Sequence, residues 1–184
     1  MEEKQDEIKK EETPKNHYVN NAVFFEAMKE WKEDVVEAEN TGESRPPVTN
    51  YIGECFLQIA EHLSYKPNFI NYPYREEMVG DGIENCLMYA HNFDPSKSKN
   101  PFSYFTQIIY YAFLRRIEKE KKQSYIKFKL LEESGDVQVN KWFKKNYFDK
   151  DPEDLNETMT KHFNLTDKDI EKFTPKKKKG RKKK

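Results

Sequence analysis

Aromatic and cationic side chains alternate along residues 100–123. At about 100 degrees per residue, four of them fall within about 40 degrees of one another on one face of a helix: Tyr104, Tyr111, Arg115 and Lys122. Such a face is typical of single-stranded nucleic-acid binding, because bases stack on aromatic rings and phosphates pair with cations. Lys97 and Lys99 in the preceding loop add positive charge. Tyrosines that only cover the edge of a core, with their hydroxyls in water, explain these residues equally well.

A second candidate surface is acidic. Opposite the apolar stripe of the next helix upstream, a ridge repeats at helical spacing: Glu77, Asp81, Glu84 and Met88. Negative charge along a helix steers a basic partner into register, and a methionine adds an adaptable apolar contact. The alternative, which spacing alone favours, is the solvated face of an amphipathic helix.

Residues for catalysis or for a metal ion form no recognisable motif. The four histidines are scattered, neither cysteine belongs to a CxxC or HxxE pattern, and the six glycines form no phosphate-binding loop. In so acidic a chain a given carboxylate is far more often solvated than catalytic. The sequence therefore predicts a protein that is not an enzyme and holds neither cofactor nor metal.

The apolar periodicity predicts an all-α fold with about four helices on one core. The helices are expected at residues 22–39, 51–63, 75–92 and 101–123, with Asn20 or Asn21 capping the first and Asn100 with Pro101 opening the fourth. The expected core stripes are Val23, Phe24, Ala27, Met28, Trp31 and Val35; Ile52, Cys55, Phe56, Ile59, Ala60 and Leu63; Val79, Ile83, Cys86, Ala90 and Phe93; and Phe102, Phe105, Ile109, Ala112 and Phe113.

Composition divides the chain into four expected parts. We expect a disordered acidic segment at 1–15, a helical domain at 16–123 with a linker at 40–50, a loosely structured extension at 124–175 and a basic tail at 176–184. Short helices are expected to start at Asp151-Pro152 and within LTDKDIEKF. The tail, KKKKGRKKK, holds 8 of the 33 basic residues, so residues 1–175 carry 25 basic and 33 acidic residues.

The basic tail on an acidic body indicates a charged partner. Nucleic acid is the first candidate and an acidic membrane surface the second, beside a merely solubilising role. Cys55 and Cys86 both fall on apolar stripes, which favours a reduced, intracellular compartment. The acidic start lacks the apolar core of a signal peptide, and no run approaches the roughly 18 apolar residues of a membrane span.

The order of residues 77–122 resembles region 2 of the sigma-70 family of transcription initiation factors. The shared frame is an acidic, apolar helix ending in Asn92-Phe93-Asp94, a short basic loop, and a helix that opens Phe-Ser-Tyr-x-Thr. YVNN at 18–21, Trp31-Lys32 and the string DGIE…HNFD…K-N-P…Y-x-T-Q…R-I-x-K-E narrow the resemblance to the late-promoter sigma factors of T-even-type bacteriophages.

The resemblance implies two functional surfaces. Glu77, Gly80, Asp81 and Glu84 match positions that dock on the coiled coil of the largest catalytic subunit of bacterial core RNA polymerase, and Met88 extends that line. Positions that hold the promoter minus-ten element and its unpaired strand match Lys97, Lys99, Ser103, Tyr104, Thr106, Gln107, Ile108, Tyr111, Leu114 and Arg115. Tyr104 would stack a base, and Arg115 with Lys122 would hold phosphates.

The chain also departs from the family. Housekeeping sigma factors have a tryptophan pair where this chain has Gln107 and Ile108, and no helix-turn-helix for a minus-thirty-five element follows. The phage family further uses a co-activator and the replication sliding clamp, which it contacts through an apolar and acidic terminal peptide. This chain has the basic tail there, and only Ile170 and Phe173 before it could serve.

The hypothesis from the sequence is a phage late sigma factor that works in the cytoplasm of an infected bacterium. It would bring core polymerase to AT-rich minus-ten-type late promoters and take part in strand opening. Two alternatives stay open: a polymerase-binding co-activator without promoter recognition of its own, and a general nucleic-acid binder driven by the basic tail.

Overall fold

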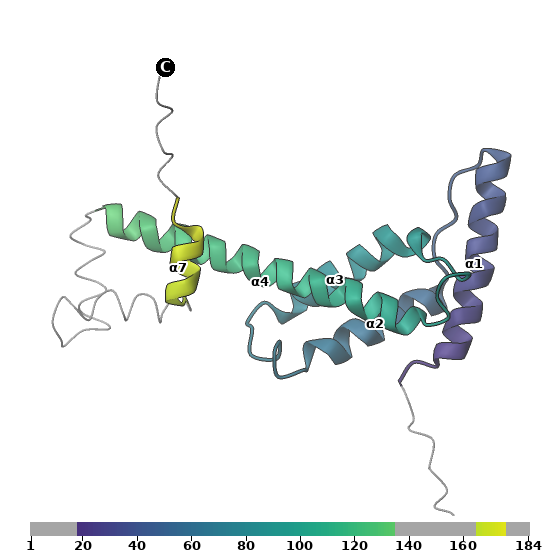
Figure 1. Ribbon diagram of the computed structural model, residues 1–184, viewed down its shortest axis with the longest axis horizontal. Coiled ribbons are helices and arrows are strands. Elements are labelled where there is room, and N and C mark those ends of the chain that lie inside the picture. The colour runs from purple at the N-terminus through teal and green to yellow at the C-terminus, as the bar shows by residue number, and fades with distance from the viewer. Residues whose placement is uncertain (1–17, 135–164, 176–184) are drawn as a thin grey trace, which may run out of the picture. The chain divides into compact units, whose positions relative to one another are not determined.

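The computed structural model describes residues 18–134 and 165–175, and within them every regular element is a helix (Figure 1). The expected all-α class is confirmed. Two compact units divide the chain, residues 1–109 and 110–184, and the division falls inside one long helix, α4. The expected segments at 1–15 and 176–184 and the helix start at 151–152 lie outside the described residues. None of the described helices is long and apolar enough to cross a membrane.

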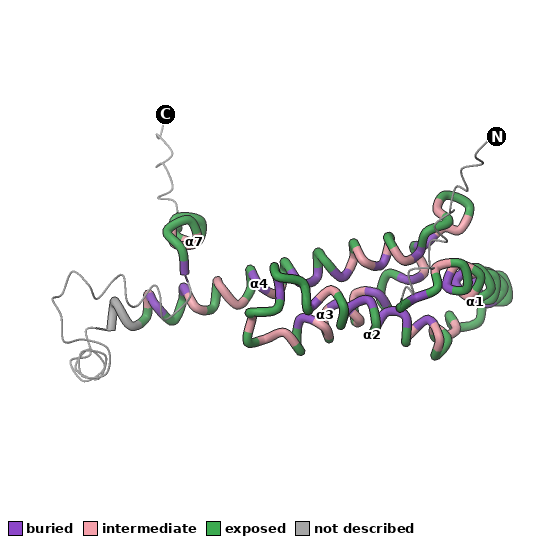
Figure 2. Tube along the Cα trace, turned by 90° about the horizontal axis from the view of Figure 1, so that it is seen from below, coloured by how far each residue is buried: buried purple, intermediate pink, exposed green. Residues whose placement is uncertain are grey.

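The described residues of the first unit, 18–109, form three helices, a short 3-10 turn and the start of α4. The bounds are α1 Asn21–Thr41, α2 Asn50–Ser64, α3 Arg75–Tyr89, η1 Ala90–Asn92 and α4 Pro101–Ser134. α2 packs against both α1 and α3. Buried positions recur along each of these helices, as amphipathic helices on a shared core require. Figure 2 shows the recurrence along α4.

Four phenylalanines form the centre of this core. The ring of Phe105 lies 4.5 Å from that of Phe56, 5.7 Å from Phe24 and 6.0 Å from Phe93. All four side chains are almost completely buried. Each of the four belongs to a different apolar stripe predicted from the sequence, and their predicted burial in the core is confirmed.

Asparagine side chains fix where two helices begin. Asn20 caps α1, its side-chain oxygen accepting from the backbone N–H groups of Ala22 and Val23 at 3.0 and 3.4 Å. Asn21 instead reaches α4: it donates to the Lys99 carbonyl at 3.4 Å and accepts from the Phe102 N–H at 3.2 Å. The first turn of a helix has N–H groups without helical partners, so Asn21 satisfies one of them.

Asn100 supplies the expected cap of α4. Its side-chain oxygen accepts from the Ser103 N–H at 3.0 Å, and Pro101 occupies the first helical position. Together with Asn21, this cap holds the start of α4 from two sides.

α1 also holds two connecting segments through adjacent residues. The Trp31 indole N–H donates to the Pro47 carbonyl at 3.0 Å, which fixes the linker before α2. The Lys32 ammonium donates to the His91 carbonyl in η1, which fixes the end of the α3 segment. Trp31 and Lys32 therefore fix two connections: the linker that enters α2 and the turn η1 that leads into the loop before α4.

Several predicted core positions were wrong. On α3 the buried residues are Met78, Gly82 and Cys86, whereas Val79 and Ile83 are half-exposed. The true stripe is displaced by one position, because Gly82 packs closely without contributing to a hydropathy pattern. On the other helices, Val23 is exposed and Ala27, Leu63 and Phe102 are half-buried, while Ala38 joins the core.

The predicted end of the fourth helix near Gln123 was also wrong, because α4 continues to Ser134. Residues 124–134 contain neither proline nor glycine, and Tyr125 and Phe128 are buried one turn apart. In the second unit the later part of α4 is joined by α7, Asp167–Phe173, which confirms the short helix expected in LTDKDIEKF.

Two glycines make a matched test of the backbone. Gly42 ends α1 with φ at 76°, whereas Gly53 lies inside α2, and a Cβ at either position would meet no atom within 4 Å. Gly42→Ala should therefore lower the free energy of unfolding by about 1–2 kcal/mol through backbone strain alone. Gly53→Ala should raise it by up to about 1 kcal/mol through helix propensity. Urea denaturation followed by circular dichroism measures both, and a neutral Gly42→Ala would contradict the left-handed cap.

Candidate nucleic-acid interface and docking face

The loop before α4 has a defined turn. The Asp94 carboxylate accepts from the Ser96 N–H at 3.0 Å and from the Ser96 hydroxyl at 2.6 Å, and it pairs with Lys97 at 2.9 Å. The Ser96 hydroxyl and then Lys97 hold the pKa of Asp94 well below its usual value, and the carboxylate in turn raises the pKa of Lys97. Lys97 is nevertheless 82% exposed and Lys99 is exposed, so both ammonium groups face solvent.

Tyr104 combines packing with partial exposure. Its ring meets Phe93 edge-on at 5.3 Å and Phe105 at 5.0 Å with an interplanar angle of 89°. Burial raises the pKa of the Tyr104 hydroxyl, so it stays protonated at neutral pH. A ring held by two aromatic neighbours loses little rotamer freedom when a further ring stacks on it. The structure agrees with both interpretations of Tyr104. Its ring packs on the edge of the core, and part of the side chain stays exposed, as a stacking platform requires.

The other predicted DNA-binding residues of the first unit differ in how far their side chains are exposed and in whether their polar groups are already hydrogen-bonded. Ser103 and Gln107 are exposed, whereas Ile108 is half-buried. The Thr106 hydroxyl donates to the Phe102 carbonyl at 2.6 Å, so its proton is used within α4. Ser103, Tyr104 and Gln107 thus present polar atoms on neighbouring positions of the first two turns.

The remaining predicted positions belong to the second unit. Tyr111, Leu114, Arg115 and Lys122 are all exposed. Tyr111 is 50% exposed, and its ring meets that of Tyr110 edge-on at 5.7 Å. Exposed aromatic and cationic groups therefore continue along α4 in this unit, as the sequence pattern predicts.

The acidic ridge lies on the side of α3 opposite its buried residues. Glu77, Gly80, Glu84 and Met88 are exposed, and Asp81 is half-buried. Leu87 and Met88 are 47% and 51% exposed, so the ridge ends in an apolar patch. The exposure of Leu87 was not predicted from the sequence.

Gly80 has no packing role within the unit. A Cβ at this position would meet no atom within 4 Å, whereas Gly82 on the same helix is buried. Glycine inside a helix costs about 1 kcal/mol relative to alanine. An exposed helical glycine with open space around it favours close approach by the backbone of a partner.

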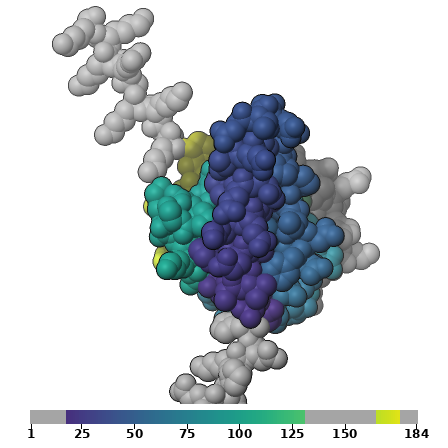
Figure 3. Space-filling view, turned by 90° about the vertical axis from the view of Figure 1, so that its right-hand side faces the viewer, coloured from purple at the N-terminus to yellow at the C-terminus, as the bar shows by residue number. Residues whose placement is uncertain are grey.

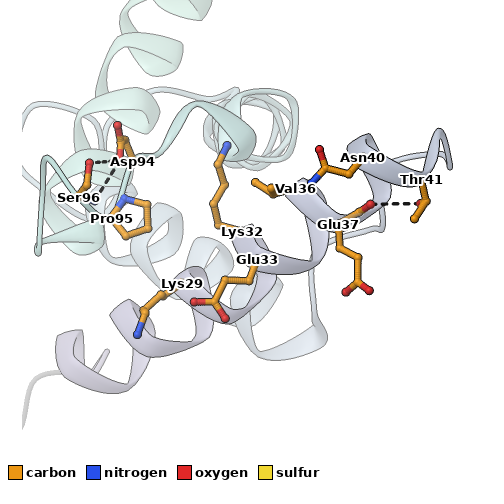
Figure 4. A pocket seen from close by; sticks show the side chains of 10 residues that line it. All are labelled: Lys29, Lys32, Glu33, Val36, Glu37, Asn40, Thr41, Asp94, Pro95 and Ser96. Carbon is orange, nitrogen blue, oxygen red and sulfur yellow. Dashed lines mark hydrogen bonds between the residues drawn. The ribbon is translucent and has the colours of Figure 1, made fainter.

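A groove on the outer face of α1 was not predicted (Figures 3 and 4). It has a volume of about 540 Å³ and lies between α1 and residues 94–96. Lys29 and Lys32 line it together with Glu33 and Glu37, and Val36 adds an exposed apolar surface. With Asp94, the lining holds three acidic and two basic side chains, a net formal charge of −1 that gives no strong preference for an anionic or a cationic ligand. The exposed Val36, on the polar side of α1, was the one signal for it in the sequence.

Formal charge follows the division into units. Residues 1–109 contain 20 acidic and 11 basic residues, a net charge of −9, and residues 110–184 contain 13 acidic and 22 basic residues, a net charge of +9. A polyanion is therefore attracted to the second unit and a basic protein surface to the first.

Neither cysteine is placed for chemistry. Cys55 and Cys86 are buried and unbridged, and burial raises the pKa of both thiols, which keeps them protonated and unreactive. In the part of the chain that the structure describes, no group of three or more His, Cys, Asp or Glu residues could hold a metal ion.

Comparison with protein-family models finds no match to this chain, and no curated protein matches it significantly.

The loop turn yields a pH prediction. The pKa of the Asp94 carboxyl lies below the ordinary 3.8, because the charged form accepts the Ser96 and Lys97 bonds. Stability from these bonds is present above the unfolded pKa and is lost as the pH falls through the folded one. NMR titration of the Asp94 carboxyl carbon should show this low midpoint, and Ser96→Ala should raise it more than Lys97→Gln does. An unchanged midpoint in Ser96→Ala would contradict the turn.

Proposed function

We propose that this chain is a transcription initiation subunit of the late sigma kind. It binds bacterial core RNA polymerase, directs it to AT-rich minus-ten-type late promoters of a bacteriophage, and takes part in strand opening. The proposal rests on the resemblance of residues 77–122 to sigma region 2. It also agrees with the separation of an acidic face on α3 from aromatic and cationic positions on α4.

The observation that carries the proposal is the bracing of Tyr104. Asn21 and Asn100 hold the first turn of α4, and Phe93 and Phe105 hold the Tyr104 ring, which remains partly exposed. Taking a base out of the DNA stack costs a few kcal/mol. An aromatic platform already fixed in position offsets that cost by about 1–3 kcal/mol per stacked base.

The remaining roles follow the exposure of each side chain. Gln107 reads or supports bases at the fork, and Tyr111 provides a second aromatic ring. Arg115 and Lys122 hold phosphates, and Lys97 and Lys99 attract the strand. Ile108 stands where housekeeping factors have an aromatic wedge, so strand opening here relies on the tyrosines.

The acidic face of α3 serves as the polymerase-docking surface. Glu77, Asp81 and Glu84 pair with basic residues on the coiled coil of the largest catalytic subunit, and Gly80 lets that coiled coil approach closely. We assign no clamp contact to Phe173, because its ring packs 5.9 Å from that of Tyr125. A co-activator would dock elsewhere on the chain.

The first test is transcription in vitro with bacterial core polymerase on a supercoiled template that carries an AT-rich octamer at minus ten. A discrete start should appear only with this protein and vanish when the octamer is scrambled. Tyr104→Leu, which keeps apolar cover over the core, should reduce open complexes by about tenfold, since stacking contributes about 1–3 kcal/mol per base. Tyr104→Phe keeps the ring and is the matched control.

The alternatives predict other outcomes. A co-activator without promoter recognition would bind polymerase yet give no octamer-dependent start, and Tyr104→Leu would then change nothing. A general nucleic-acid binder would lose its activity when residues 176–184 are removed, whereas promoter choice should survive that removal.

The docking face is tested with two helical glycines. Gly80→Gln and Gly53→Gln both add a side chain where a Cβ meets no atom within 4 Å, so both variants should fold. Only Gly80→Gln should weaken binding to core polymerase, by roughly tenfold, which corresponds to about 1.4 kcal/mol. Fluorescence anisotropy of the labelled chain measures it. Equal affinities of the two variants would remove Gly80 from the docking surface.

A further inference from the structure

The groove on α1 is long enough to hold a second helix. Its lining on α1 extends from Lys29 to Thr41, which is about 18 Å at 1.5 Å per residue, and residues 94–96 form the opposite wall (Figure 4). Its volume is about 540 Å³. An opening of this length, parallel to a helix, is suited to a helical segment that lays one face into it.

Apolar groups lie on both sides of the groove. Val36 on α1 is 45% exposed, and Pro95 in the loop is half-buried. Figure 4 shows the Lys32 side chain between these two residues. The Lys32 ammonium is bonded to the His91 carbonyl, so its alkyl chain adds apolar surface to the groove. An apolar side chain of a partner would therefore remove apolar surface from water on both sides.

Both walls of the groove are fixed within the first unit. The bond from Lys32 to the His91 carbonyl joins α1 to the turn before the loop. Within the loop, the Asp94 carboxylate accepts from the Ser96 N–H and hydroxyl at 3.0 and 2.6 Å. Because the walls are already ordered, a partner that enters the groove loses little affinity to ordering them.

The charges that remain available in the groove are mostly negative. Of the five charged side chains that line it, Lys32 is held by a backbone carbonyl and Asp94 by its own turn. Lys29, Glu33 and Glu37 are exposed, and none of the three has an ion-pair partner among the described residues. Two carboxylates and one ammonium group therefore remain for a partner.

The two carboxylates belong to a longer acidic row along α1. Its four residues lie within about 60 degrees of one another at about 100 degrees per residue, and they are Glu26, Glu30, Glu33 and Glu37. All four are exposed, and in the part of the chain that the structure describes none pairs with a cation. The row is about 16 Å long and its spacings are four, three and four residues. Lysines or arginines at the same spacings on a second helix would lie opposite these carboxylates.

We infer that the groove between α1 and residues 94–96 docks a basic amphipathic helix of a partner protein. One apolar stripe of that helix packs on Val36 and Pro95, and its cations face the acidic row. A nucleic acid or an anionic membrane is the wrong partner for this surface, because the row repels phosphates. The docking goes beyond the proposed initiation role and does not depend on it.

The kind of partner is tested on the full chain with a fluorescein-labelled peptide of about 18 residues, or about 27 Å as a helix. The peptide carries leucine along one helical face and lysine on both flanks, and its control has glutamate in place of every lysine. Fluorescence anisotropy should show the lysine peptide binding at least about tenfold more tightly. No binding at millimolar concentration, or equal binding of the two peptides, overturns the proposal.

The position of the site is tested with two valines of α1. Val36 lines the groove, whereas Val23 lies outside it and is 51% exposed. Val36→Gln should weaken binding of the lysine peptide by about tenfold, because an apolar contact is lost. Val23→Gln should leave the affinity within about twofold of the wild-type value. Equal effects of the two substitutions overturn the groove as the site.

The acidic row is tested by charge reversal at constant net charge. Glu33→Lys with Glu37→Lys reverses two carboxylates of the groove, and Glu54→Lys with Glu61→Lys reverses two exposed carboxylates of α2. Only the first pair should weaken binding of the lysine peptide by about tenfold or more, since the second changes the net charge equally but lies on another helix. Equal weakening by both pairs overturns the specific site in favour of general attraction.

Two further measurements separate the remaining outcomes. All substituted side chains are exposed, so circular dichroism with urea denaturation should show wild-type folding of each variant. Analytical ultracentrifugation of the wild-type chain should show a monomer, and a dimer that Val36→Gln dissociates would make a second copy the occupant and overturn a separate partner. No polymerase or promoter is present, so failure of this docking leaves the octamer-dependent start of the proposed function unaffected.

Discussion

The packing of Phe105 against Phe24, Phe56 and Phe93 is the interaction on which the first unit depends. By area, burying four such rings contributes on the order of 6–12 kcal/mol, which is comparable to the whole net stability of a small domain. The four rings come from α1, α2, the loop after η1 and α4, so they join three helices of the unit and the loop that leads into α4. The ring that could stack a base, Tyr104, adjoins Phe105 in sequence and in space. Its orientation is therefore a consequence of the core.

Apolar packing alone would not determine where α4 begins, because phenylalanine rings tolerate small shifts along a helix axis. Polar groups with few possible partners supply that register. Asn21 bonds on both sides of the start of α4, Asn100 caps it, and Lys32 holds the His91 carbonyl upstream of the loop. Each bond adds only about 0.5–1.5 kcal/mol to stability, yet each leaves a buried or helix-terminal group unsatisfied if the chain shifts. The motifs YVNN and Trp31-Lys32 thus have a structural explanation independent of any family.

Sequence periodicity predicted the helices and most of the core because helix faces repeat at a fixed spacing. It misplaced the α3 stripe, since Gly82 packs through its backbone and carries no hydropathy signal. It also ended α4 too early. Apolar and cationic residues alternate in IKFKLL, residues 126–131, and this pattern fits a strand as well as a helix. The packing of Tyr125 against α7, which favours the helix, is a tertiary contact that the pattern does not contain. Exposure of the candidate residues was largely predictable from the same pattern. The engagement of Thr106 by the Phe102 carbonyl and the groove beside Val36 depend on local geometry and tertiary packing, which one-dimensional patterns do not contain.

The net charge of the chain is informative only when it is counted separately for the two units, whose boundary lies inside α4. A net formal charge of zero is the sum of −9 in residues 1–109 and +9 in residues 110–184. Long-range fields act on partners separately at each surface, because charges separated by more than the Debye length of about 8 Å are largely screened at physiological salt. An acidic unit and a basic unit on one chain can therefore attract a basic protein surface and a nucleic acid at the same time. Among the described residues of the second unit, Glu118, Glu120 and Asp169 pair with Lys172, Arg116 and Lys121, while Lys119 and Lys122 on α4 are exposed.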